Sequence, residues 1–238
     1  MANLITIGRV LLLFAAIGMI YTDIYWLVFA AGWLIAIVFL GDGVDGWVAR
    51  KRGSTSKFGA VFDIAGDRVV ENVLWVVFAH LGVVPVWIPL VVITRSFTVD
   101  AVRSAALEYG FTAFGDSTMM RSSFTRFLTS SRFSRAYYGW SKALAFVFLT
   151  WLYAWQLPGA DGKLLDLVYD FQVFRFVVWF LAYSSVALCV IRGLPVLYDS
   201  LYYLRDDAPP PAAEASVTRE GSTTPKLTTE SSEHGRPV

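Results

Sequence analysis

The sequence of 238 residues contains little charge and only one cysteine. Charged residues make up 16% of it, whereas about a quarter of an ordinary soluble domain is charged. The 20 Lys and Arg residues nearly balance the 19 Asp and Glu residues, so the net charge of +1 gives no reason to expect a nucleic-acid partner. The single Cys189 excludes a disulfide framework and a thiolate metal site. The 56% of hydrophobic residues is instead typical of a membrane protein.

Six apolar stretches approach the length of about 20 residues that a membrane-spanning helix needs. Short polar or Gly- and Pro-containing turns separate them. The expected fold is therefore all-α, a polytopic integral membrane protein with six transmembrane helices. We place these helices at about 7–22, 24–49, 58–81, 84–109, 136–156 and 171–204.

The basic residues of the connections predict which side of the membrane each loop faces. Apart from Lys163, the first, third and fifth connections lack basic residues, so the second and fourth should face the cytoplasm. Both termini are then cytoplasmic, and the membrane is expected to be the inner or plasma membrane. The basic residues of the second and fourth connections are Arg50, Lys51, Arg52, Lys57, Arg121, Arg126, Arg132 and Arg135.

Two further segments differ in composition from the spans. Residues 205–238 are rich in Pro, Ser, Thr, Glu and Gly, which predicts a disordered cytoplasmic tail after a membrane domain of residues 1–204. Met119 to Phe133 alternates arginines with large apolar residues, which indicates either a helix in the headgroup layer or a solvated linker.

Four aspartates lie where a membrane protein should have few. A charge at the bilayer centre costs about 2.5–3.5 kcal/mol on insertion scales, and less near the interface. The acids are three and four residues apart within each pair, so each pair falls on one face of its helix. Two adjacent antiparallel helices could bring all four carboxylates together. They are Asp42, Asp45, Asp63 and Asp67.

An oxygen-rich cluster without His or Cys favours hard cations, so we expect two Mg²⁺ or Mn²⁺ ions. Small residues beside the acids, Gly43, Gly46 and Gly59, would let a phosphate ligand approach the backbone. Arg50 follows Gly46 by one turn and could meet a phosphate oxygen. The alternative is that the acids only form ion pairs with Arg50, Lys51, Arg52 and Lys57.

Together these residues form a long motif. It reads Asp42-x-x-Asp45-Gly46-x-x-Ala49-Arg50, eight residues, then Gly59-x-x-x-Asp63-x-x-x-Asp67. All eight identities and spacings resemble the signature of the CDP-alcohol phosphatidyltransferase family, and the resemblance covers about residues 1–204. It implies a membrane-embedded homodimer that transfers the phosphatidyl group of CDP-diacylglycerol to an acceptor alcohol and releases CMP.

The resemblance also implies roles for individual residues. Asp42, Asp45 and Asp63 would hold two divalent ions, and Asp67 would complete the second ion's shell. Asp67 would also be the general base that takes the proton of the acceptor hydroxyl. The residues that would line the CDP site are Gly46, Ala49, Arg50 and Gly59.

Three cations suggest that the acceptor carries a phosphate. Arg95 and Arg103 are eight residues apart on the fourth expected helix, hence on one face, and Lys142 is near the start of the fifth. Alternatively, the two arginines could pair with Asp100 or Glu108, or reach lipid phosphates.

Within the family, the sequence is most similar to the phosphatidylglycerophosphate synthases. Its opening, Asn3-Leu4-Ile5-Thr6-Ile7-Gly8-Arg9, resembles their Asn-x-x-Thr-x-x-Arg. The pair Asp67-Arg68 differs from their Asp-Lys and is more similar to relatives that use inositol. The expected acceptor is glycerol 3-phosphate, and inositol phosphate or another alcohol is the alternative.

Two functions from other classes use the same features. Carboxylates inside membrane segments also occur in divalent-cation transporters, which would place the acids near mid-membrane and open them to both sides. A family-like scaffold without activity would recruit partners through residues 205–238. The acids beside the basic stretch 50–57 argue against the transporter, and the intact motif argues against the scaffold.

Overall fold

The computed structural model describes the backbone of residues 2–52, 57–108 and 132–203 and most of their side chains. The side chains outside the description are those of 2–4, 42–52, 57, 58, 60, 103, 105–108, 132–135, 196 and 199–203. In the described ranges the chain forms six long helices, one short helix and no strand. They are α1 (Ala2–Ile20), α2 (Tyr25–Arg52), α3 (Lys57–His80), α4 (Trp87–Glu108), α6 (Arg132–Gln156), α7 (Leu164–Tyr169) and α8 (Gln172–Tyr203).

The all-helical fold is confirmed for these residues. Each long helix agrees within about five residues with one of the six apolar stretches, since a continuous apolar run leaves few alternatives to a helix. The segment from Met119 to Phe133, expected to be either a surface helix or a solvated linker, lies largely outside the described residues. The expected tail of 205–238 lies wholly outside them.

Only one helix of the described chain is long and apolar enough to cross a membrane by itself, the stretch Gln172–Pro195 of α8. Two shorter apolar stretches are Ile5–Ile20 in α1 and Tyr25–Gly41 in α2. Charged residues interrupt the other helices, for example Glu71 in α3. The structure therefore confirms the helices but not the six-span topology.

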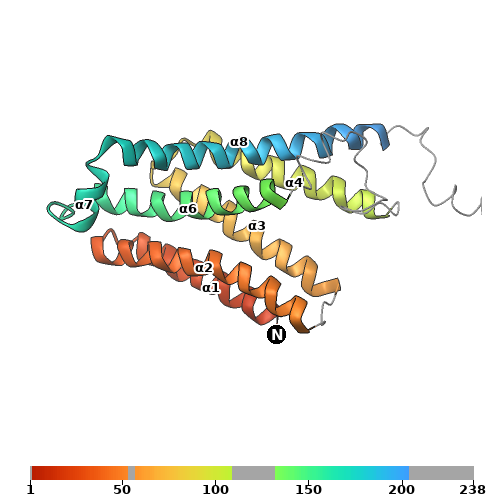
Figure 1. Ribbon diagram of the computed structural model, residues 1–238, viewed down its shortest axis with the longest axis horizontal. Coiled ribbons are helices and arrows are strands. Elements are labelled where there is room, and N and C mark those ends of the chain that lie inside the picture. Colours follow the sequence, from red (N-terminus) through yellow and green to blue (C-terminus); the bar gives the residue numbers. More distant parts are fainter. Residues whose placement is uncertain (1, 53–56, 109–131, 204–238) are drawn as a thin grey trace, which may run out of the picture.

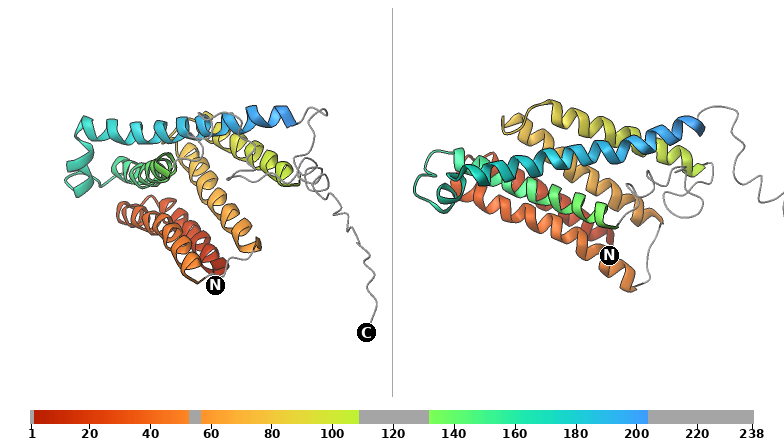
Figure 2. Two further views of the ribbon diagram at one scale, coloured as in Figure 1. Left: turned by 45° about the vertical axis from the view of Figure 1, so that its right-hand side comes forward. Right: turned by 45° about the horizontal axis from the view of Figure 1, so that its top comes forward.

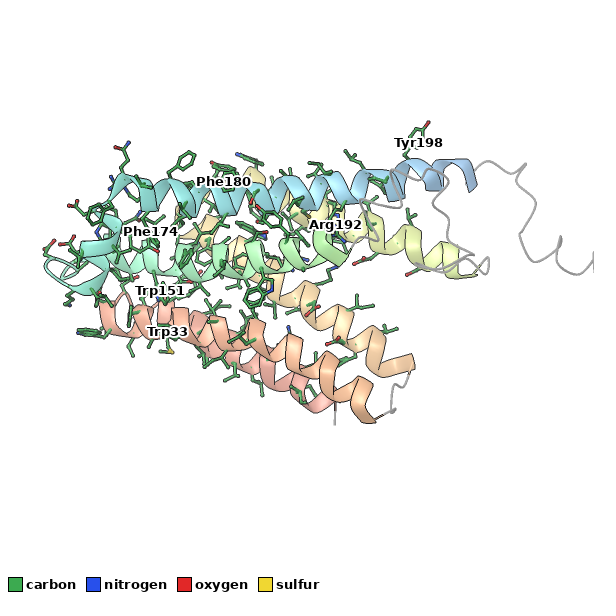
Figure 3. The ribbon with its side chains drawn as sticks, in the orientation of Figure 1. Trp33, Trp151, Phe174, Phe180, Arg192 and Tyr198 are labelled. Carbon is green, nitrogen blue, oxygen red and sulfur yellow. The ribbon has the colours of Figure 1, made fainter. Side chains whose placement is uncertain are left out.

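Large apolar side chains lie on the outside of every long helix. Water solvates such a surface poorly, and a continuous apolar exterior indicates an apolar environment or a partner. Figure 3 shows Tyr198 pointing away from the bundle. Examples, with their exposed fractions, are Leu11 (65%), Trp33 (55%), Val61 (66%), Phe97 (69%), Trp140 (60%) and Phe176 (69%).

The six long helices form a ring in which each packs on two others. Going round it, α1 contacts α2, α2 contacts α6, α6 contacts α8, α8 contacts α4, α4 contacts α3, and α3 returns to α1. Figures 1 and 2 show α3 crossing between the α1–α2 pair and the α4–α8 pair. Although α2 and α3 are consecutive in the chain, they are not main packing partners of each other, and both pack on α1.

Aromatic rings fill the interior of this ring of helices. Phe146 of α6 is fully buried, and its ring centroid is 4.8 Å from that of Trp75 and 6.1 Å from that of Phe78, both on α3. Phe39 of α2 stacks on Phe146 at 5.5 Å. The apolar core therefore joins α2, α3 and α6, three helices that also line a cavity between them.

The short helix α7 connects α6 to α8 at one end of the bundle (Figure 1). Asp166 accepts hydrogen bonds from the backbone N–H of Gly162 (3.0 Å) and from Nε1 of Trp155 (3.2 Å). These bonds hold the pKa of Asp166 below its ordinary value because they stabilise the charged carboxylate. The bond from the Gly162 backbone has the larger effect. Asp166 thus orders a connection that the sequence indicated only as a turn.

A missing side chain at Gly32 lets α2 and α6 approach closely. A Cβ atom at this position would overlap the indole ring of Trp151, coming within 2.6 Å of Cδ1. Trp151 itself is fixed, because its Nε1 donates a hydrogen bond to the carbonyl oxygen of Phe29 at 3.0 Å. The glycine is therefore required by packing and not by backbone conformation.

We expect Gly32→Ala to destabilise the protein by about 1–3 kcal/mol, because the added methyl must displace Trp151 or separate the helices. Thermal unfolding in detergent would measure the loss. Gly18→Ala is the matched control, since a Cβ there meets no atom within 4 Å and alanine favours helix. An equal loss for both variants would contradict this account of Gly32.

Candidate functional site

The predicted site residues divide into those whose side chains the structure describes and those it does not. Five of them belong to the C-terminal half of α2, where the helical backbone is described and the side chains are not. Convergence of all four acids therefore stays a prediction. The five residues are Asp42, Asp45, Gly46, Ala49 and Arg50.

Asp63 and Asp67 lie one turn apart on α3, as the spacing predicted. A single guanidinium, that of Arg9 on α1, contacts both. Its Nη2 is 2.9 Å from Asp67 Oδ1, and its Nη1 is 3.7 Å from Asp63 Oδ1. The two carboxylates are 41% and 44% exposed, so a ligand can still reach them.

Oxygen donors of this kind suit a hard divalent ion. Among the side chains that the structure describes, no three His, Cys, Asp or Glu residues gather into a metal-binding group. Asp42 and Asp45 lie outside that set, and Asp63 with Asp67 supplies two of the four predicted ligands. Gly59, the predicted CDP-site residue on α3, is partly buried one turn before Asp63.

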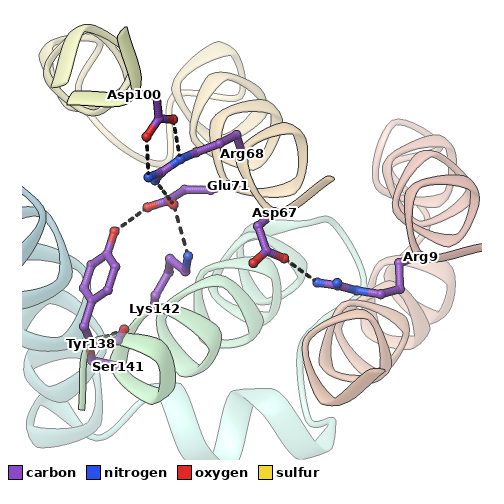
Figure 4. Close-up of polar contacts among 8 residues, drawn as sticks. All are labelled: Arg9, Asp67, Arg68, Glu71, Asp100, Tyr138, Ser141 and Lys142. Carbon is purple, nitrogen blue, oxygen red and sulfur yellow. Dashed lines mark hydrogen bonds and ion pairs between the residues drawn. The ribbon is translucent and has the colours of Figure 1, made fainter. Parts of the chain in front are cut away.

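A second polar cluster, one turn further along α3, was not predicted. Its centre is Glu71, which is only 2% exposed. Glu71 accepts a hydrogen bond from the hydroxyl of Tyr138 (2.7 Å) and another from Nζ of Lys142 (3.0 Å), both on α6. Nη1 of Arg68 is 3.6 Å from Glu71 Oε2. Figure 4 shows these contacts between α3 and α6.

Arg68 joins the same cluster to α4. Its Nε and Nη2 donate to the two carboxylate oxygens of Asp100, at 2.9 and 3.2 Å. Asp100, an alternative partner proposed for Arg95, is thus paired with Arg68 in the structure. The signal that could have indicated this cluster is Glu71 itself, a further acid four residues after Asp67 in an apolar helix.

The three predicted acceptor-binding cations have different surroundings. Lys142 is paired with Glu71, and its Nζ lies 5.2 Å from the centre of the Tyr138 ring. Arg95 packs its side chain against Gly193 of α8, where a Cβ would come within 2.6 Å of its Nε. This buried Nε has no hydrogen-bond partner among the described residues. The side chain of Arg103 lies outside the described set.

Sequence reasoning missed one further cation near this cluster. Arg192 of α8 has its Cζ 5.6 Å from the centre of the Tyr138 ring, on which Lys142 also lies. A charge inside the long apolar stretch Gln172–Pro195 of α8 was the available signal. Cations from two helices, α6 and α8, thus lie near the ring of Tyr138.

A cavity of about 380 Å³ lies between α2, α3 and α6. Among the described residues of its lining, the charged ones are Asp67 and Lys142, so the cavity connects the Arg9–Asp67 pair with the Glu71 cluster. The remaining lining is mostly apolar. It consists of Ala36, Phe39, Leu40, Val70, Ala136, Gly139, Trp140, Ala143, Leu144 and Val147. The space could hold a small polar group against a largely apolar wall.

A family model and several known proteins match this sequence. The model of the CDP-alcohol phosphatidyltransferase family matches residues 1–191. The CDP-diacylglycerol–glycerol-3-phosphate 3-phosphatidyltransferase of Pseudomonas fluorescens is 33% identical over 115 residues, 46% of this chain and 57% of that protein. Its Escherichia coli K12 namesake is 29% identical over 110 residues, 45% of this chain and 60% of that protein.

A protein of Mycobacterium tuberculosis named putative cardiolipin synthase is 42% identical over 69 residues, 28% of this chain and 33% of that protein. The matches to these three relatives thus span from a third to three fifths of their lengths. The family match, by contrast, covers most of the present chain. This protein therefore belongs to the CDP-alcohol phosphatidyltransferase family.

Proposed function

We propose that this protein is a phospholipid-synthesising enzyme that transfers a phosphatidyl group from CDP-diacylglycerol to the hydroxyl of a phosphorylated alcohol. The acceptor is glycerol 3-phosphate, the product is phosphatidylglycerophosphate, and CMP is released. The observation that carries the proposal is the cavity in which Asp67 and Lys142 are the charged lining residues. Family membership and two relatives named for this reaction support it.

The enzyme is embedded in the membrane through residues 1–204, with α1, α2, α3, α4, α6 and α8 as its six spans. The apolar exterior of these helices supports this arrangement. The basic loops put the aspartates and both termini on the cytoplasmic side. Residues 205–238 form a cytoplasmic tail, and the family resemblance adds a homodimer.

Two Mg²⁺ or Mn²⁺ ions would be held by Asp42, Asp45, Asp63 and Asp67. The described part of this set fits, because Asp63 and Asp67 share a helix face and remain about two-fifths exposed. When bound, such ions neutralise phosphate charge and so favour attack on phosphorus. Gly46, Ala49, Arg50 and Gly59 hold the CDP group beside them.

Asp67 takes the proton of the acceptor hydroxyl. The acceptor oxygen forms a bond to the phosphorus of the phosphatidyl group, and the bond from that phosphorus to the bridging oxygen breaks. CMP leaves with the electron pair of the broken bond. The position of Asp67 in the cavity lining supports this role, because a carboxylate there is next to space for an acceptor.

Lys142, Arg95 and Arg103 bind the phosphate of the acceptor. Lys142 lines the same cavity as Asp67, so one acceptor molecule can present its hydroxyl to one group and its phosphate to the other. Glu71 already balances part of the Lys142 charge at 3.0 Å, which favours moderate affinity for the anion.

An acceptor screen tests the proposal. Purified protein with CDP-diacylglycerol should release CMP with glycerol 3-phosphate and Mg²⁺ or Mn²⁺, and EDTA should abolish the release. Inositol phosphate, inositol, serine and phosphatidylglycerol run in parallel. A higher rate with any of these would replace the acceptor assignment, whereas metal flux into liposomes without nucleotide, together with no CMP release, would contradict the transferase.

A further inference from the structure

The geometry points to Arg9 as an internal counter-ion that holds Asp63 and Asp67 in place when no divalent ion is bound. This inference rests on the proposed metal site and adds to it a positioning residue from another helix. The first observation is the burial of Arg9, which is 4% exposed although it carries a permanent charge. A buried guanidinium requires compensation, and Arg9 finds it in both carboxylates.

The guanidinium connects three helices. Its Nε donates a hydrogen bond to the carbonyl oxygen of Val38 on α2 at 3.1 Å, while Nη2 donates to Asp67 on α3 at 2.9 Å. Figure 4 shows Arg9 reaching from α1 toward Asp67. The planar fork of arginine allows these contacts at once, which a lysine ammonium would not reproduce.

The backbone around Arg9 leaves room for this arrangement. A Cβ on Gly41 of α2 would lie in ordinary van der Waals contact, 3.5 Å from both Cγ and Cδ of Arg9, so α2 passes close to the stem without crowding it. One turn before Arg9, the methyl group of Thr6 occupies the place that a side chain on Gly66 would take. Because Gly66 precedes Asp67, this close approach of α1 and α3 brings the guanidinium to the carboxylate.

Thr6 and Arg9 belong to the Asn-x-x-Thr-x-x-Arg motif at the start of the chain. In the structure the two residues act together. Thr6 determines how closely α1 approaches α3, and at that distance the guanidinium of Arg9 reaches Asp67. The positive charge of Arg9 would repel a divalent ion at Asp63 and Asp67. Removing that charge should therefore tighten metal binding and at the same time weaken the metal-free fold.

The test measures Mn²⁺ binding and thermal unfolding of the purified full-length protein, with Mn²⁺ or with EDTA. For Arg9→Met we expect a dissociation constant at least about tenfold lower than in the unchanged protein. We also expect the midpoint of thermal unfolding in EDTA to be lower for Arg9→Met than for the unchanged protein. Adding Mn²⁺ should raise this midpoint by more in Arg9→Met than in the unchanged protein. The matched control is Arg68→Gln, which breaks the pair with Asp100 and should lower both midpoints without changing Mn²⁺ affinity.

A second measurement does not depend on the folding of Arg9→Met. In side-chain NMR of ¹⁵N-arginine protein, Mg²⁺ should shift the Arg9 Nε signal, which Arg9→Lys identifies by its loss. An unchanged Arg9 signal at saturating Mg²⁺, or an unchanged Mn²⁺ dissociation constant in Arg9→Met, would overturn the counter-ion role. Failure of the unchanged protein to bind Mn²⁺ would instead overturn the proposed metal site, and this inference with it.

Discussion

Asp67→Asn should reduce the rate of CMP release by about 10² to 10⁴-fold, the usual contribution of a positioned general base. An amide cannot take the acceptor proton, and it is also a poorer ligand for a hard divalent ion than a carboxylate. The substitution nearly preserves volume, so the cavity that Asp67 lines should keep its shape. The rate is measured with saturating CDP-diacylglycerol, glycerol 3-phosphate and Mg²⁺.

Asp100→Asn is the matched control. Asp100 is also a partly exposed carboxylate paired with an arginine, but it lies on α4 and does not line the cavity. We expect Asp100→Asn to release CMP at a rate within about threefold of that of the unchanged protein. The two variants are compared once thermal unfolding in detergent shows them to be equally stable. A rate above a tenth of normal for Asp67→Asn would remove Asp67 from the role of base.

Glu71→Ala should destabilise the fold by about 3–5 kcal/mol, because it leaves the charge of Lys142 buried without its partner. The hydroxyl of Tyr138 loses its acceptor in the same step. For a chain of this size, the expected fall in unfolding midpoint is roughly 10 °C. Thermal unfolding in detergent, at fixed protein and detergent concentration, measures it.

Two companion variants separate charge from packing in this cluster. Glu71→Gln keeps a hydrogen-bond acceptor for Tyr138 and removes only the charge, so it should lose less stability than Glu71→Ala. A Glu71→Met and Lys142→Met double variant removes both charges and should recover part of the loss of Glu71→Ala. If the double variant loses as much unfolding free energy as Glu71→Met and Lys142→Met lose together, Glu71 and Lys142 are not coupled.

The positions of the helices could be predicted from the sequence because apolar runs and breakers are local signals. α2 and α8 begin within one residue of the expected stretches, and α3 ends one residue before its own. The exception is α7, which is six residues long and has no strong apolar period. Burial of Leu165 and Tyr169 fixes it, and that depends on neighbours far along the chain.

The candidate site could be predicted only in part. Asp63 and Asp67 share a helix face because four residues make about one turn, which needs no tertiary information. Their shared partner, Arg9, is 58 residues from Asp67, and Lys142 is 71 residues from Glu71. Side chains so far apart meet only through the order in which the helices pack, and spacing in the sequence does not contain that order.

The sequence by itself therefore determined the all-helical class, the membrane composition and the family motif, because these depend on local periodicity and residue type. Only the tertiary structure decided which charges meet. It paired Lys142 with Glu71, Arg68 with Asp100, and Arg9 with Asp63 and Asp67. The physical reason is that a buried charge must find a partner, and the ring of helices offers partners from non-consecutive segments.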